Sequence, residues 1–335
     1  MLTPERIDPR NADDFNAWYD AWTEALEDGR EFPTSWSREE MLVGLTRDEK
    51  YWAQEIWIIR DGSREVAGGL FVEIPLADNT DSMRITLGVV PAYRRQGYGT
   101  ALFGAARQIA AERMRTRLLA VVEAVDEKSP GAAFAEGFGF TLANTEMHRV
   151  LELPVDEALL TRLAVEAAEK HDGYKLVTWQ DRCPDELVDA FAQLHTVFAA
   201  EAPSGEIDHQ PEVWDAERIR FREEQSIAQG RHGWITVAIA PDGTLAGHTE
   251  LYVPETDLGN IYQWDTLVVP AHRGHRLGLA LKVRNHLELQ QTDPGKAVVH
   301  TWNARQNDHM NAVNAQLGFR PVEAHQEWQL KLGDG

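Results

Sequence analysis

The sequence predicts an α/β fold made of two tandem copies of one unit of strands and helices. In each half an apolar strand ends at a proline, and a basic turn and a long helix follow. The turns begin at Arg94 and Arg273, which are 179 residues apart (273 minus 94). A Gly-Phe pair near the end of each half, at Gly139 and Gly318, has the same separation. An offset that is kept at two landmarks indicates duplication of one unit.

The predicted elements follow the same order in both halves. Each half opens with an amphipathic helix, in which apolar residues recur at helical spacing. Two strands joined by an Asp-Gly turn come next, because this dipeptide favours a tight turn between apolar runs. A third strand, the basic turn, a long helix and a fourth strand follow, and a short helix precedes each Gly-Phe pair. We expect helices at 15–26, 100–114, 186–198 and 279–289, and strands at 57–59, 66–74, 85–90, 118–123, 174–177, 234–237, 245–253, 261–269 and 297–301.

The chain length also fits two domains. A domain has roughly 150 residues, and this chain has 335. Either half is long enough to bury its own core. We predict a first domain at 1–155, a connector helix at 156–173 and a second domain at 174–335.

Composition and charge exclude several classes of partner. A hydrophobic content of 43% and a charged content of 26% are those of an ordinary soluble globular protein. The formal net charge of −21 argues against nucleic acid and against anionic membrane surfaces. Two interpretations of this charge stay open. It keeps the protein soluble, or it steers a cationic substrate such as an amine toward an acidic cleft.

The single cysteine and the absence of apolar runs bear on location. Cys183 is the only cysteine, so an intrachain disulfide is excluded and a reducing compartment fits. The N-terminal residues lack the basic and apolar regions of a signal peptide, and no run approaches the roughly 18 apolar residues of a membrane span. We therefore expect a cytoplasmic protein without a membrane partner, and both a monomer and a homodimer stay open.

The first basic turn, Arg94-Arg95-Gln96-Gly97-Tyr98-Gly99-Thr100, predicts an anion site. The first N–H groups of a helix have no intrahelical partner, and the helix dipole favours negative charge there. Glycine lets the backbone approach a phosphate because no Cβ stands in the way. Other nucleotide motifs fit less well. The third glycine of a dinucleotide fingerprint is replaced by Leu102, and the Gly-Lys-Ser/Thr of a P-loop is absent.

With its strand, proline, basic glycine turn, helix and closing Gly-Phe in this order, the chain resembles a tandem GNAT acyltransferase. The family signature is Gln/Arg-x-x-Gly-x-Gly/Ala, which residues 94–99 satisfy in full. The resemblance implies two GNAT-type α/β domains, each with a mixed, mostly antiparallel sheet flanked by helices. It also implies that the turn holds the pyrophosphate of acetyl-CoA and that the preceding strand contacts pantetheine. The residues it assigns to the cofactor are Val89, Arg94, Arg95, Gln96, Gly97, Tyr98, Gly99, Thr100, Val268, Arg273, His275, Arg276, Leu277, Gly278 and Asn307; no residue is assigned to a metal.

Each half departs from the family pattern in a different place. In the second turn Arg276 replaces the first signature glycine, where it either adds a phosphate contact or blocks the approach of the backbone. Family members often carry an asparagine eleven residues before the Gly-Phe glycine; the second half has Asn307 there and the first has Lys128. The usual catalytic tyrosine, four residues before the same glycine, is replaced by Ala135 and Asn314.

Acyl transfer to an amine needs a base and a donor for the oxyanion. Our candidates for the catalytic base are Glu250, Asp265 and Glu73, on strands expected to face the cofactor. Each also has a structural interpretation: the glutamates as exposed edge-strand carboxylates, and Asp265 as a brace for the strands. His248 is a further candidate, which we interpret as a surface residue. His309 on the closing helix could serve as an acid, but we give it no role. Cys183 has no histidine partner nearby, which favours direct transfer in a ternary complex.

Two functions of different class follow. The first is an acetyl-CoA-dependent N-acetyltransferase that acts on a small-molecule amine; its carboxylates and Asn307 favour the second half as the catalytic one, and the opposite assignment stays open. The second is a non-catalytic acyl-CoA-binding or scaffold protein, which the absence of both tyrosines favours.

Overall fold

The computed structural model describes residues 2–124, 129–201, 205–257, 259–292, 295 and 297–333. It divides into two compact units. The first unit contains Met1–Thr145, Ser204–Gln210 and Ala324–Gly335, and the second contains Glu146–Pro203 and Pro211–Glu323. In the part of the chain that is described, no helix is long and apolar enough to cross a membrane.

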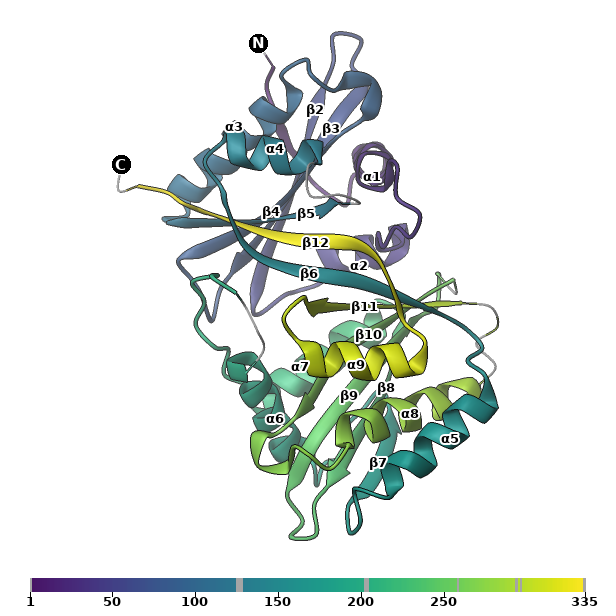
Figure 1. Ribbon diagram of the computed structural model, residues 1–335. Helices are drawn as coiled ribbons and strands as arrows, with labels where there is room; N and C mark the ends of the chain where they lie inside the picture. The colour runs from purple at the N-terminus through teal and green to yellow at the C-terminus, as the bar shows by residue number, and fades with distance from the viewer. Residues whose placement is uncertain are drawn as a thin grey trace. The chain divides into compact units, whose positions relative to one another are not determined.

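The first unit is a sheet with helices on both faces (Figure 1). Its strands lie in the order β1-β2-β3-β4-β5-β12. Neighbouring strands in this order pair antiparallel, except β4 and β5, which pair parallel. One face packs on the aromatic side chains of α1, and the other packs on α3. The elements are β1 Glu5–Ile7, α1 Ala12–Glu27, α2 Arg38–Thr46, β2 Trp52–Arg60, β3 Val66–Pro75, β4 Ser82–Val89, a 3₁₀ turn Pro91–Tyr93, α3 Tyr98–Glu112, β5 Arg117–Ala124, α4 Pro130–Gly137, and the end of β12 Arg320–Lys331.

The second unit repeats this arrangement. Its strands lie in the order β6-β11-β10-β9-β8-β7, with β10 and β11 parallel and the other neighbours antiparallel. One face packs on α6 and α7, and the other packs on α5, α8 and α9. The elements are the end of β6 Thr141–Glu152, α5 Glu157–Ala168, β7 Lys175–Gln180, α6 Val188–Glu201, α7 Ala216–Ala228, β8 Arg231–Ile239, β9 Leu245–Pro254, β10 Asn260–Val268, a 3₁₀ turn Pro270–His272, α8 Leu277–Gln290, β11 Val298–Ala304 and α9 Asp308–Leu317.

The predicted fold class, α/β with a mixed, mostly antiparallel sheet flanked by helices in each unit, is confirmed. The expected helices and strands all form, with ends that differ by a few residues. The connector helix α5 packs along α8 as part of the second core, because its apolar stripe includes Leu160 and Leu163. The division into domains at 155 and 174 stays a prediction, and the two units are interleaved along the chain rather than divided at one point.

Each unit takes its last strand from the other half of the sequence. Residues 324–331 of β12 pair with β5 in the first unit, and residues 146–152 of β6 pair with β11 in the second. Neither sequence half therefore contains all the strands of one unit.

A truncated chain tests this exchange. We expect residues 1–155 alone to lose the partner of β5 and to expose an unpaired strand edge, which favours aggregation. This fragment should melt at a lower temperature than the first transition of the full chain, or precipitate, in a thermal scan followed by circular dichroism. A soluble fragment with the melting temperature of the full chain would contradict the exchange.

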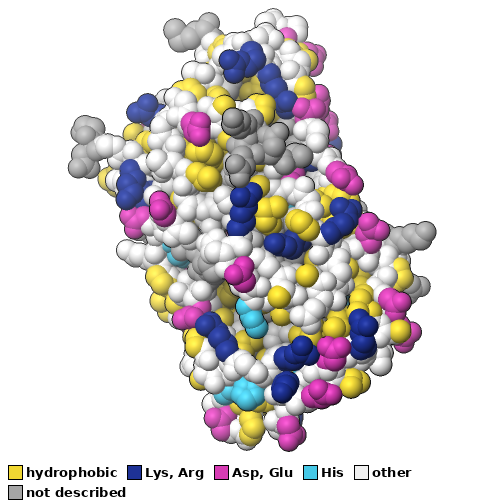
Figure 2. Space-filling view, in the orientation of Figure 1, with side chains coloured by type: hydrophobic (Ala, Val, Ile, Leu, Met, Phe, Trp, Pro, Cys, Tyr) yellow, Lys and Arg dark blue, Asp and Glu magenta, His cyan; other side chains and the backbone are white. Residues whose placement is uncertain are grey.

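Acidic and basic side chains are interspersed over the visible face of the molecule (Figure 2). The charge of −21 is therefore not gathered in one acidic area of that face. This distribution fits the interpretation that the charge serves solubility.

Candidate active site

The helices that follow the two basic turns begin without a side-chain cap. In α1, α2, α4, α5, α7 and α9 a serine, aspartate or asparagine accepts a hydrogen bond from the first turn. In α3 and α8 the N-cap residues are Gly97 and Arg276, and neither makes such a bond. The first N–H groups of these two helices are thus left to an external acceptor, which is the property of an anion site.

Gly97 and Arg276 share one backbone conformation. Both are left-handed, with φ of 92° and 55°. Glycine adopts this conformation without strain, and arginine does so at some cost. The second turn therefore keeps the path of the first although its glycine is lost. The Arg276 side chain turns toward α5, where Nη1 lies 3.3 Å from Glu166 Oε2.

Two equivalent arginines hold the turns to the preceding elements. Arg94 donates from Nε to the Val89 carbonyl at 3.0 Å, and its Nη1 lies 2.6 Å from Asp28 Oδ2. Arg273 donates to the Val268 carbonyl at 3.3 Å and pairs with Glu201 at 2.9 Å. These contacts position the turn, so the backbone N–H groups remain as its main anion donors.

The other residues assigned to the cofactor lie in or beside these turns. Arg95, Gln96, Gly97 and Thr100 are exposed, whereas Tyr98 is buried in the first core. His275 is exposed and its Nδ1 lies 3.1 Å from the Lys170 carbonyl, while Leu277 and Gly278 are buried at the start of α8. Asn307 caps α9, accepting from the Met310 N–H at 3.3 Å. Lys128 lies outside the described residues.

In each unit the two parallel strands separate next to the turn. Pairing of β4 with β5 ends at Ile85 and Ala120, and pairing of β10 with β11 ends at Tyr262 and His300. Beyond these pairs the described residues of β4 do not pair with β5, and those of β10 do not pair with β11. A strand whose backbone groups lack a partner on one side can accept an extended ligand there.

Asp265 lies in a β-bulge of β10. Gln263 pairs with Leu251 and Thr266 with Thr249, so Trp264 and Asp265 together lie opposite Glu250. The Gln263 amide fills the bulge by donating to the Glu250 carbonyl at 2.6 Å. A bulge redirects side chains, and here it lies beside the separation of the strands. In the first unit no bulge interrupts the pairing of β3 with β4 between the pairs Gly68–Val89 and Glu73–Arg84.

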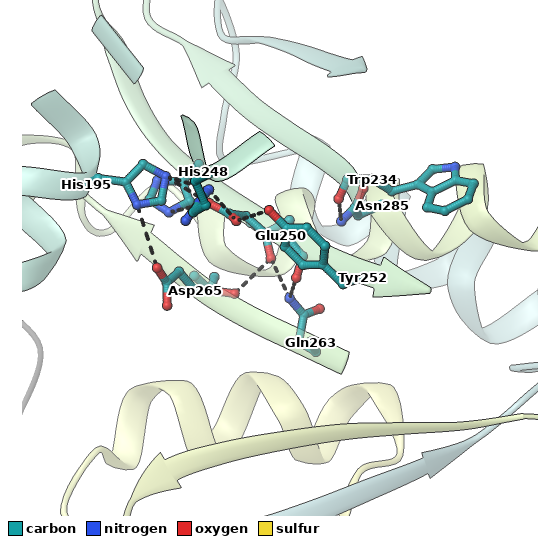
Figure 3. Close-up of polar contacts among 11 residues, drawn as sticks. His195, Trp234, His248, Glu250, Tyr252, Gln263, Asp265 and Asn285 are labelled. Carbon is teal, nitrogen blue, oxygen red and sulfur yellow. Dashed lines mark hydrogen bonds and ion pairs between the residues drawn. The ribbon is translucent and has the colours of Figure 1, made fainter. Parts of the chain in front are cut away.

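Four titratable side chains of the second unit converge on one face of the sheet (Figure 3). His195 of α6 lies with Nε2 2.9 Å from Glu250 Oε1 and with Nδ1 3.7 Å from Asp265 Oδ2. His248 Nε2 lies 3.6 Å from Glu250 Oε1. Glu250 is 0% exposed and the Asp265 side chain 29%, so Asp265 is the member of the cluster that solvent and ligands reach.

Arg222 of α7 neutralises this cluster. Its Nη2 lies 2.9 Å from Glu250 Oε2 and 3.3 Å from His195 Nε2. The Tyr252 hydroxyl donates to the same Glu250 oxygen at 3.2 Å. Glu250 is therefore a fully buried carboxylate with a cation, a hydroxyl and an imidazole as partners, which is how a buried charge becomes tolerable.

The surroundings separate the pKa values of the two carboxyl groups. Burial alone would raise the pKa of Glu250, but the Arg222 guanidinium holds it well below its ordinary value. Burial, together with the negative charge of Glu250, raises the pKa of Asp265 to about 7. Burial also lowers the pKa of His195, and it lowers that of His248 to about 3, so both rings are neutral near neutral pH. Two carboxyl groups with separated pKa values are a frequent basis of acid–base chemistry.

The same four side chains are of types that bind a metal. Donor atoms of His195, His248, Glu250 and Asp265 lie within 4.8 Å of one another. The Arg222 guanidinium, however, occupies the positively charged place beside Glu250 and His195. Because this cation already balances the carboxylate, we assign the cluster no metal ion.

The structure corrects two structural interpretations of the sequence. Glu250 and Glu73 lie on β9 and β3, which have a neighbouring strand on each side, so neither is an edge-strand residue. His248 is 0% exposed and not a surface residue, because it shares the face of β9 with Glu250 under α6. Glu73 lies opposite Arg84 in the pairing of β3 with β4, and burial raises the pKa of its carboxyl group.

The first unit has no titratable side chains at the positions equivalent to 248, 250 and 265 of this cluster. Subtracting 179 from 248, 250 and 265 leads to Gly69, Phe71 and Thr86. Trp18 and Trp22 of α1 fill the space over this face, with Trp18 Nε1 2.8 Å from where a Cβ on Gly69 would lie. Trp22 packs edge-on against Phe71. The equivalent face of the first unit is therefore an aromatic core.

Sequence reasoning missed His195, Arg222 and Tyr252. His195 falls in the predicted helix at 186–198, and a histidine on the buried face of a helix was the one available signal. Arg222 lies on α7, for which no helix was predicted. Its role depends on a contact with Glu250 that no local pattern encodes. Trp214, just before α7, packs on His195 and under Arg222.

The sequence and the fold were compared with known proteins. Residues 15–140 match the model of the acetyltransferase (GNAT) family. No curated protein matches the sequence. A tandem GNAT protein from the clavulanic acid biosynthesis pathway is 28% identical, with a TM-score of 0.81 and coverage of 100% of both chains.

Two further solved structures share the fold. A GCN5-related N-acetyltransferase from Sphaerobacter thermophilus is 15% identical, with a TM-score of 0.69 over 100% of this chain and 96% of that one. The N-myristoyltransferase of Saccharomyces cerevisiae is 12% identical, with a TM-score of 0.59 over 98% of this chain and 79% of that one. Residues 15–140 thus match the acetyltransferase (GNAT) family, and over its whole length the chain has a fold similar to that of a tandem GNAT protein.

Proposed function

We propose that the protein is an N-acetyltransferase that moves the acetyl group of acetyl-CoA to a small-molecule amine, and that the second unit performs the transfer. One observation carries this proposal. Next to the separated strands, the second unit has Asp265, His195 and Glu250, while the first has Thr86 and tryptophans. Acyl transfer to an ammonium-forming substrate needs a base, and the second unit alone offers a cluster of them among the described residues.

In this proposal Asp265 is the base. Its Oδ2 is 3.7 Å from His195 Nδ1, too far for a hydrogen bond, so the carboxylate remains free to accept a proton. A pKa of about 7 suits a base that works near neutral pH, because it is ionised there and still holds a proton well. His195 links it to Glu250: Nε2 of the ring lies 2.9 Å from Glu250 Oε1, and Nδ1 faces Asp265 Oδ2 at 3.7 Å.

The reaction then needs few further groups. The amine attacks the thioester carbonyl carbon and forms the C–N bond while it passes a proton to Asp265. The C–S bond then breaks, and its electron pair leaves with CoA as the thiolate. The oxyanion that develops is stabilised by backbone N–H groups of the separated strand β10. Cys183 takes no part, because burial raises the pKa of its thiol to about 12.

The first unit suggests a binding role. It keeps the complete turn with Gly97 and an uncapped α3, but it lacks the titratable cluster. We therefore propose that it binds acyl-CoA without catalysing transfer. The chain as a whole would be a non-catalytic binding protein only if the second unit proved inactive as well.

Matched substitutions in the two turns test which unit acts. Gly99 and Gly278 are the second residues of α3 and α8, and a bulky residue at either places a side chain beside the uncapped N–H groups. We expect G278V to reduce release of free CoA with a responsive amine by at least tenfold, and G99V to change it less than twofold. Calorimetry with acetyl-CoA should show that each variant loses one binding event.

Two other results would revise the proposal. Loss of turnover in G99V alone would place the chemistry in the first unit. A wild-type protein that binds acetyl-CoA but releases no CoA with a broad panel of amines would favour the binding protein.

A further inference from the structure

A chain of three polar side chains crosses the core of the second unit from α8 to β11. Lys282 Nζ donates to Asn314 Oδ1 at 2.8 Å, and Asn314 Nδ2 donates to Asn303 Oδ1 at 2.5 Å. Lys282 is 1% exposed and Asn314 is 0% exposed, whereas Asn303 is partly exposed at the end of the chain. None of these residues belongs to the cluster around Asp265.

The chain has a fixed direction. A lysine amine beside an amide oxygen acts as the donor, so the oxygen of Asn314 faces Lys282 and its NH₂ group faces Asn303. The side-chain oxygen of Asn303 accepts this bond from Asn314, so the NH₂ group of Asn303 is the last donor of the chain. Among the described residues this group has no acceptor. Donors linked in one direction polarise one another and strengthen the last of them.

The free end of the chain lies where the strands separate. Asn303 is three residues beyond His300 on β11, and Asp265 is three residues beyond Tyr262 on β10, counted from the last pair of the two strands. Asn303 contacts α9 and Asp265 approaches α6, which lie on opposite faces of the sheet. A group held between the strands therefore has a base on one side and an amide donor on the other.

Packing in the first unit is apolar at the corresponding places. Subtracting 179 from 282 and 314 leads to Phe103 and Ala135. Both belong to the first hydrophobic core. In the second unit burial lowers the pKa of Lys282 to about 7, a sign of how unfavourable the apolar surroundings are for its charge. Lys282 buries an amine at the position where the first unit packs Phe103. Because the amine is the less stable choice there, we look for a role other than stability.

We propose that Asn303 donates a hydrogen bond to the leaving sulfur of CoA during acyl transfer, and that Asn314 and Lys282 hold it in place. This inference rests on the proposed function. When the C–N bond has formed and the C–S bond breaks, the electron pair of that bond passes to sulfur. The resulting thiolate accepts the N–H of Asn303, and it takes up a proton from solvent after release. Asn303 is then a catalytic residue, and Asn314 and Lys282 are positioning residues.

The ionisation of bound CoA tests this directly, without turnover. In full-length G99V protein, which keeps only the second turn intact, the thiolate of bound CoA is followed by ultraviolet absorbance against pH. The pKa of the CoA thiol should lie about one unit below that of free CoA, because a hydrogen bond to the charged form favours it. Cys183 does not interfere, since the pKa of its thiol is about 12.

Three variants locate the cause of that shift. Lys282→Met has a similar volume without the donor, and Asn303→Ala removes the last amide; each should return the thiol pKa to that of free CoA. Phe103→Leu, at the corresponding position of the first unit, should leave it lowered. Bound CoA with the pKa of free CoA would overturn this inference and leave acyl transfer intact. Failure of CoA to bind the second unit would overturn the proposed function itself.

A double-mutant cycle on turnover separates positioning from general damage to the core. N303A and K282M should each lower kcat by about tenfold or more, with the KM for acetyl-CoA changed less than twofold. The double variant should be no slower than the slower single variant, because Lys282 acts only through Asn303. If the two losses in kcat multiply in the double variant, or if KM rises while kcat stays unchanged, Lys282 does not position Asn303.

Discussion

Replacing Asp265 by asparagine should lower kcat/KM for acyl transfer by about a hundredfold or more, because general acid–base catalysis contributes roughly 10²–10⁴. The wild-type rate should fall as pH drops through about 7, since protonation of Asp265 removes the base. The D265N variant should lose this dependence. The measurement is the rate of CoA release against pH with one amine at fixed excess.

Glu73→Gln provides the matched control in the first unit. Glu73 is a partly exposed carboxyl group that burial also affects, but it lies next to Arg84 and away from any histidine cluster. We expect E73Q to retain at least half of the wild-type rate. An E73Q variant as slow as D265N, or a D265N variant with an unchanged pH profile, would show that Asp265 is not the base.

Replacing Glu250 by glutamine should destabilise the protein by about 3 kcal/mol, because it leaves the Arg222 charge without its buried partner. The two groups are 2.9 Å apart, and the Glu250 side chain is 0% exposed. Urea unfolding followed by tryptophan fluorescence measures the change. Substituting both partners by apolar residues, as in E250L/R222M, should recover most of the loss, since no unpaired charge remains.

The pH dependence of this effect has a defined sign. Arg222 holds the pKa of Glu250 below its ordinary value of 4.5, so the pair stabilises the fold at neutral pH and above that value. The stabilisation is lost as pH falls through the lowered pKa of Glu250. The difference in free energy of unfolding between wild type and E250Q should then become smaller. Two results would contradict a paired buried carboxylate. One is an E250Q variant less stable than wild type by under about 1 kcal/mol at neutral pH, and the other is a difference in free energy of unfolding that grows in acid.

The catalytic candidates show where sequence reasoning reaches its limit. Glu250 and Asp265 could be named because they are carboxylates on strands that the pattern predicts. Their partners could not be. His195 and Arg222 reach Glu250 from two helices, across 55 and 28 residues of sequence (250 minus 195 and 250 minus 222). Such contacts depend on how helices pack on the sheet, which apolar spacing along one element does not specify.

By itself the sequence determined the duplication, the order of the elements and the two basic turns. These features depend on local spacing: an apolar run, a proline, a glycine turn and the start of a helix. Only the tertiary structure decided which unit has titratable groups beside the separated strands. The bulge that brings Asp265 opposite Glu250 is a matter of strand register, and the chain from Lys282 to Asn303 is a matter of helix packing. Both arise from pairing between distant residues, so no window of neighbouring residues contains them.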